Sequence, residues 1–129
     1  MTMLSKHSVL IIFSFSLFFI VNPAMASMRE SISNTITNMA LDLSCDKNEQ
    51  CKSIGFGDKA CGGFQSYKIY SIKNLNEDSF IKIVNSYNAL DKENNLKNNM
   101  ASTCDILIKP STSCIQGQCA SSVGNFSIY

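Results

Sequence analysis

The sequence has no tryptophan, and its single histidine, His7, lies in an N-terminal segment that we expect to be removed. Serine–histidine–acid and cysteine–histidine mechanisms need a histidine as general base, and many zinc sites need one as a ligand. Glycine-rich phosphate loops and paired-carboxylate motifs are also missing. The sequence therefore predicts a protein that is not an enzyme and that uses no cofactor.

A cluster of charge of one sign is also missing. The 129 residues include 11 basic and 10 acidic side chains, giving a formal net charge of +1, and these are scattered singly along the chain. Phosphate backbones and anionic lipid surfaces are recognised by clustered lysine and arginine. We therefore expect no nucleic-acid partner.

The six cysteines include no Cys-x-x-Cys pair, which argues against thioredoxin-like redox chemistry and against a cysteine zinc site. No metal site is therefore predicted. An even number of cysteines in a small exported chain is typical of a disulfide framework. We expect all six to be bridged: Cys45, Cys51, Cys61, Cys104, Cys114 and Cys119.

Export is predicted from the N-terminus. An apolar run from Val9 to Val21 follows Lys6, is broken by Asn22 and Pro23, and leads to the small residues of Ala24-Met25-Ala26. This is the pattern of a secretory signal peptide. The run is shorter than the roughly 20 residues of a transmembrane helix. We therefore expect residues 1–26 to be a cleaved signal peptide, with no stable membrane insertion afterwards, and residues 27–129 to form one periplasmic or secreted domain.

The pairing of the cysteines is open, because six cysteines allow 15 connectivities. The favoured prediction joins Cys114 to Cys119 across a hairpin turn and Cys45 to Cys51 across a short loop. Cys61 and Cys104 then form the long-range bridge. A rival prediction pairs the two hairpin-like segments crosswise.

Hydrophobic periodicity predicts an α+β fold in which two helices pack on a small antiparallel sheet stapled by disulfides. Apolar residues three and four apart predict one helix over 28–43, capped by Ser27, and a second beginning near Asn74 or Asn76. A short strand is predicted between Gln50 and Phe56. The sheet is expected to contain strands 67–72 and 105–109 and the hairpin 114–119, with a last edge strand over 123–129.

The densest group of cysteine and glycine runs from Cys45 to Gly63, and two residues in or beside it are candidates for partner contact. Lys59, on a loop that a disulfide would hold, resembles the exposed basic residue of a small protease inhibitor, although a solvated turn lysine is the simpler interpretation. Phe64 follows the glycine pair and belongs to a set of aromatic residues that could form a recognition patch.

Taken together, CDKNEQCKSIGFGDKACGG from Cys45, the YKIYS segment, Ser102-Thr-Cys-Asp and the pair Cys114 and Cys119 resemble small exported, cysteine-rich proteins of Gram-negative bacteria. The resemblance spans Cys45 to Cys119 and departs at Phe64, where such proteins have proline. It implies a periplasmic or secreted bacterial protein, and it brings no activity or catalytic residue with it.

These observations lead to one functional hypothesis and one alternative. The hypothesis is a non-enzymatic binding or inhibitory module, held rigid by disulfides, that recognises a protein partner. The alternative is a structural or envelope-associated protein that acts within an assembly.

Overall fold

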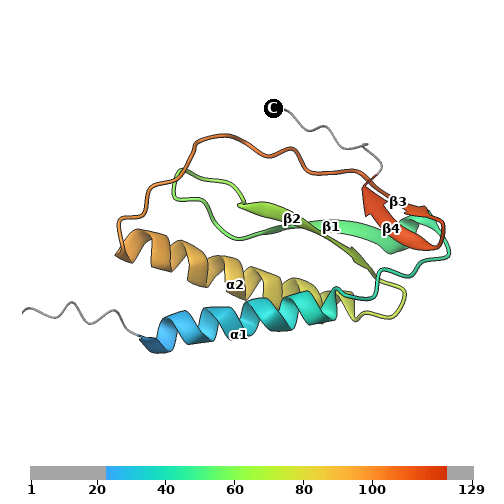
Figure 1. The fold of residues 1–129 in the computed structure, drawn as a ribbon, viewed down its shortest axis with the longest axis horizontal. Helices are drawn as coiled ribbons and strands as arrows, with labels where there is room; N and C mark the ends of the chain where they lie inside the picture. The colour runs from blue at the N-terminus through green and yellow to red at the C-terminus, as the bar shows by residue number, and fades with distance from the viewer. Residues whose placement is uncertain (1–22, 122–129) are drawn as a thin grey trace, which may run out of the picture.

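Two helices cover one face of a two-stranded sheet, and a hairpin and a long connecting segment lie on its other side (Figure 1). This computed structural model describes residues 23–121. The order is α1 (Pro23–Met39), a 3-10 turn η1 (Asn48–Gln50), β1 (Cys51–Phe56), β2 (Ser66–Ser71), α2 (Glu77–Lys97), β3 (Thr112–Ile115) and β4 (Gln118–Ser121). Residues 98–111, which connect α2 to β3 and lie in neither helix nor strand, are called the strap here.

Both sheets are antiparallel pairs. β1 pairs with β2 from Cys51 opposite Ser71 to Phe56 opposite Ser66. β3 and β4 form a tight hairpin, whose turn residues Gln116 and Gly117 have φ angles of 53° and 76°. Two consecutive positive φ angles are the signature of a type I′ turn, which matches the twist of the strands that it joins.

Side-chain alternation along β1 and β2 separates the two faces of their sheet. Ile54 and Phe56 of β1 and Tyr70 of β2 pack toward the helices. There they meet the main apolar core, whose buried members are Ile36, Tyr70, Phe80, Val84 and Tyr87. On the opposite face, Cys51 and Ile69 belong to a second cluster built around the disulfides.

Helix α2 has well-defined ends. Asn76 caps its N-terminus by accepting a hydrogen bond from the Ser79 amide at 2.9 Å. At the other end Asn99 adopts a left-handed conformation (φ 46°), and the Met100 amide donates to the Asn95 carbonyl at 3.0 Å. This is the Schellman arrangement that satisfies the last carbonyls of a helix. It fixes the point at which the strap begins.

The predicted α+β class, with two helices on a small antiparallel sheet stapled by disulfides, is confirmed. The bounds of the first helix were predicted wrongly. It begins at Pro23, where proline suits a first helical position, so Ser27 is not its cap. It ends at Met39, because the chain must turn there to bring Ser44 and Cys45 beside the β3–β4 hairpin.

The predicted composition of the sheet was also wrong. Residues 105–109 form no strand, and the β3–β4 hairpin is a separate sheet from β1–β2. No strand ladder holds residues 105–110 within the described part of the chain. Side chains of β1 and of the loop after β1 hold them instead. Ser53 Oγ donates to the Pro110 carbonyl at 3.0 Å, and Lys59 Nζ donates to the Asp105 carbonyl at 2.7 Å.

Two predictions concern residues at the ends of the chain. Most of the predicted signal peptide and the whole of the predicted strand 123–129 lie outside the described residues. Within residues 23–121, neither helix is long and apolar enough to cross a membrane.

Tyr70 provides a test of the core. Burial raises its pKa to about 12, with a further contribution from the hydrogen bond to Glu77 at 3.0 Å. Because the raised pKa favours the neutral phenol in the folded state, this contribution to stability is complete below about pH 10 and is lost as pH rises through about 12. Ultraviolet absorbance of tyrosinate should show a phase near pH 12 that Tyr70→Phe removes. An ionisation of Tyr70 near pH 10 in the folded protein would contradict this packing.

Candidate binding site

The four cysteines nearest the two sheets are bridged crosswise. Cys45 is bonded to Cys114, and Cys51 is bonded to Cys119. The favoured prediction of bridges within each segment was therefore wrong, and the crosswise rival is correct. Cys114 and Cys119 do face each other in the hairpin register, but both side chains project from it toward other segments. The third bridge, Cys61 to Cys104, is as predicted.

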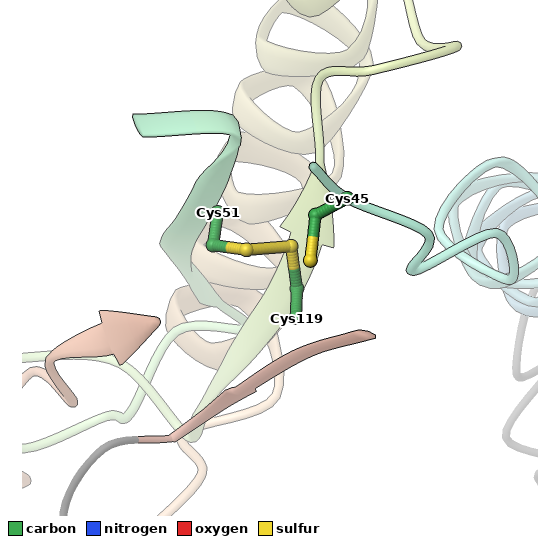
Figure 2. A group of neighbouring side chains, drawn as sticks. All are labelled: Cys45, Cys51 and Cys119. Carbon is green, nitrogen blue, oxygen red and sulfur yellow. A yellow bond between two sulfur atoms is a disulfide. The ribbon is translucent and has the colours of Figure 1, made fainter. Parts of the chain in front are cut away.

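The crossed bridges bring sulfur atoms close together. The Sγ atoms of Cys45, Cys51 and Cys119 lie within 4.8 Å of one another and are buried, and Figure 2 shows the Cys45 sulfur beside the Cys51–Cys119 bond. Zinc binds cysteine as thiolate, and disulfide sulfur carries no such charge. In its oxidised form the cluster therefore cross-links the chain and does not bind a metal as thiolate. Three such bridges indicate an oxidising, extracytoplasmic compartment.

Polar side chains on one face of α2 hold the loop that follows β1. Asn88 accepts from the Gly57 amide at 2.8 Å and donates to the Gly55 carbonyl at 3.0 Å. Asn95, seven residues further along the helix, donates to the Asp58 carbonyl at 2.6 Å. Residues spaced at three, four and seven lie on one face of a helix, so these side chains line up along the loop.

Asp91 lies between these two asparagines and is only 1% exposed. One carboxylate oxygen accepts from the Asp58 amide at 2.8 Å and from the Gln65 side chain at 2.9 Å. The other is paired with Arg29 of α1. A single buried carboxylate thus connects both helices and both ends of the loop. Such a group is tolerated inside a protein only when its charge and lone pairs are satisfied.

The structure does not hold Lys59 out to solvent. Its side chain is 9% exposed, and its ammonium lies 2.9 Å from Oδ2 of Asp105 in the strap. Hydrogen bonds from Thr103 and then from Lys59 lower the pKa of Asp105. Both interpretations of Lys59, the solvated turn lysine and the exposed, inhibitor-like lysine, were therefore wrong about its exposure. Lys59 lies beside the strap. Its ion pair with Asp105 joins the loop to the strap next to the Cys61–Cys104 bridge, which joins the same two segments.

Phe64, the other predicted contact residue, is 41% exposed and covers a glycine. A Cβ atom added to Gly55 would lie 2.2 Å from the Phe64 ring, so the ring occupies the space of a β1 side chain. Its edge also contacts Tyr67 of β2, with ring centroids 5.8 Å apart. Phe64 is thus fixed on the sheet with part of its surface left accessible.

An open groove of about 500 Å³ lies between the loop and the C-terminal end of α2. Its loop wall consists of residues 58–63, where Gly62 and Gly63 have φ angles of 105° and 85° that other residues rarely adopt. The opposite side, formed by the end of α2 and the start of the strap, presents a mixture of cationic, amide and apolar groups: Lys92, Asn95, Leu96, Asn99 and Met100. Such a combination suits binding by apolar contact with a few polar anchors.

Sequence reasoning missed the residues that build this site from the α2 side. Asp91, Asn88 and Asn95 have the helical spacing of one face, which is the signal that could have grouped them. That spacing does not reveal their partners, which lie more than 25 residues away in the sequence.

Replacement of Asp91 tests the support of the loop. Asp91→Ala removes the acceptor of Arg29 and of the Asp58 amide, and one of the two acceptors of the Gln65 side chain. It should therefore lower the free energy of unfolding by about 3 kcal/mol or more. Glu93→Ala, which removes the exposed ion pair with Lys97, should change it by less than about 0.5 kcal/mol. Chemical denaturation measures both. A loss for Asp91→Ala as small as that of the control would show that the carboxylate does not hold the loop.

A double-mutant cycle tests the contact between Gly55 and Phe64. Gly55→Ala should cost about 1–3 kcal/mol of stability, because its methyl group displaces the aromatic ring. In the background Phe64→Ala the same change should cost much less. Equal costs in both backgrounds, measured by denaturant unfolding, would mean that the ring does not cover Gly55.

Comparisons with protein-family models, curated proteins and solved structures find no match to this chain, so the resemblance to exported cysteine-rich proteins of Gram-negative bacteria stays a prediction.

Proposed function

We propose that this protein is a non-enzymatic, protein-binding module of the periplasm or the extracellular space, and that the groove beside the loop is its binding site. The observation that supports this most is the fixed loop wall of the groove. Three contacts hold this wall: the Cys61–Cys104 bridge, the Lys59–Asp105 ion pair and the hydrogen bonds from the polar face of α2. A preformed surface loses little conformational entropy when a partner binds.

The chemistry of the groove favours a protein partner. Leu96 is 71% exposed on the helix side, and Met100 beside it is also exposed. Exposed apolar side chains along an open groove fit the side chains of another protein, while Lys92 and Asn95 can satisfy polar groups at the edge. The site offers no histidine or cysteine thiolate as a nucleophile or base. Binding is therefore the function that it supports best.

A matched pair of variants tests this proposal. Leu96→Asp places a charge in the groove, whereas Leu41→Asp places one at an equally exposed leucine (70%) that does not line it. Oxidised protein should capture a partner from the periplasm or medium of its producing cells. Leu96→Asp should reduce capture at least tenfold in affinity, and Leu41→Asp should leave it unchanged.

Equal capture by both variants would contradict the groove as the binding site. Turnover of a substrate by the purified oxidised protein, without added cofactor, would contradict the non-enzymatic part. Recovery of the protein only within a stoichiometric envelope complex, again with no effect of Leu96→Asp, would favour the structural alternative.

A further inference from the structure

The strap exposes two isoleucines almost completely. Ile106 is 90% exposed and Ile108 is 91% exposed, whereas Leu107 between them is 38% exposed. Alternation of this kind is typical of extended chain, in which residues i and i+2 project to the same side. The strap therefore presents two adjacent apolar side chains that no described part of the chain covers.

This stretch is fixed at both ends and unpaired between them. At one end Cys104 is bonded to Cys61 and the Asp105 carbonyl accepts from Lys59, and at the other the Pro110 carbonyl accepts from Ser53. Within residues 23–121, the backbone groups of Ile106 to Lys109 make no hydrogen bond. Exposed, unpaired backbone on an extended segment is a template for an added strand.

The sequence of the stretch, Asp-Ile-Leu-Ile-Lys, is complementary to itself when read in the opposite direction. An antiparallel pairing centred on Leu107 places Ile106 opposite Ile108 of the second copy. It also places Asp105 opposite Lys109 of the second copy. Apolar and opposite-charge pairs directly across from each other are the ones that stabilise antiparallel strands.

The charged side chains are available for this pairing. Asp105 is 57% exposed. Thr103 and Lys59 already donate to it, but two carboxylate oxygens have about four acceptor sites, so the carboxylate can accept from a second cation. Lys109 is exposed, and within residues 23–121 it forms no ion pair. Charge complementarity and apolar pairing thus agree on the same register.

We propose that two copies of this protein associate through residues 105–109, which pair as antiparallel strands across a two-fold axis at Leu107. The contact is isologous and closes on itself, so it yields a dimer and not a filament. It leaves the groove beside the loop on each copy outside the paired stretch, so the dimer presents two binding sites. A two-site dimer gains avidity toward a multivalent partner.

Analytical ultracentrifugation of the oxidised protein over a range of concentrations tests this proposal. The mass should approach that of two chains, and amide hydrogen exchange should slow at Ile106 to Lys109 as the dimer forms. Ile108→Ser should raise the dissociation constant of the dimer about tenfold, because it removes two cross-strand apolar pairs. Leu41→Ser, at another exposed aliphatic residue, should leave the constant unchanged.

The charge pairing is tested separately. Lys109→Glu should weaken the dimer, with less effect in high salt, because it places Glu opposite Asp105 in both pairs; Lys109→Arg should preserve it. A monomer at all concentrations would overturn the proposal. So would a monomer with protected amides at 106–109, which would mean that the chain's own residues 122–129 cover the strap. A dimer unaffected by Ile108→Ser would place the contact elsewhere.

Discussion

The buried carboxylate of Asp91 is the contact through which the two helices and the loop after β1 are joined. It pairs with Arg29 of α1 and accepts hydrogen bonds from Asp58 and Gln65, so each of these elements depends on its position. Together these partners offset the cost of removing the Asp91 charge from water. These contacts make the loop conformation specific, and the groove beside it inherits that specificity.

The crossed disulfides hold the side of the β1–β2 sheet that faces away from the helices. The main apolar core, centred on Phe80 and Val84, lies between the sheet and the helices and cannot hold the β3–β4 hairpin. The bridges from Cys45 to Cys114 and from Cys51 to Cys119 join that hairpin to the first half of the chain. Because each one closes a long loop in the unfolded chain, they restrict the unfolded state more than bridges within a hairpin would.

The strap shows how the same framework leaves surface available for contact. Lys59 and Ser53 bind its carbonyls from one side, and this keeps it close to β1 without a strand ladder. Its apolar residues consequently remain exposed. A segment with strand-like sequence thus becomes a fixed but unpaired edge, while the neighbouring loop forms the wall of the groove. The two surfaces that we propose for recognition therefore share one anchor, the Lys59–Asp105 pair beside Cys61–Cys104.

The sequence by itself determined the features that depend on local pattern. The α+β class, the strands near 50–56 and 67–72, a second helix starting near Asn74 or Asn76 and the disulfide framework all follow from periodicity, capping and cysteine number. Only the tertiary structure decided the crosswise bridges, the burial of Lys59 and the role of Asp91. Each of these depends on a partner more than 25 residues away in the sequence. Local pattern reports which side chains an element presents, and the packing of distant segments decides which of them meet.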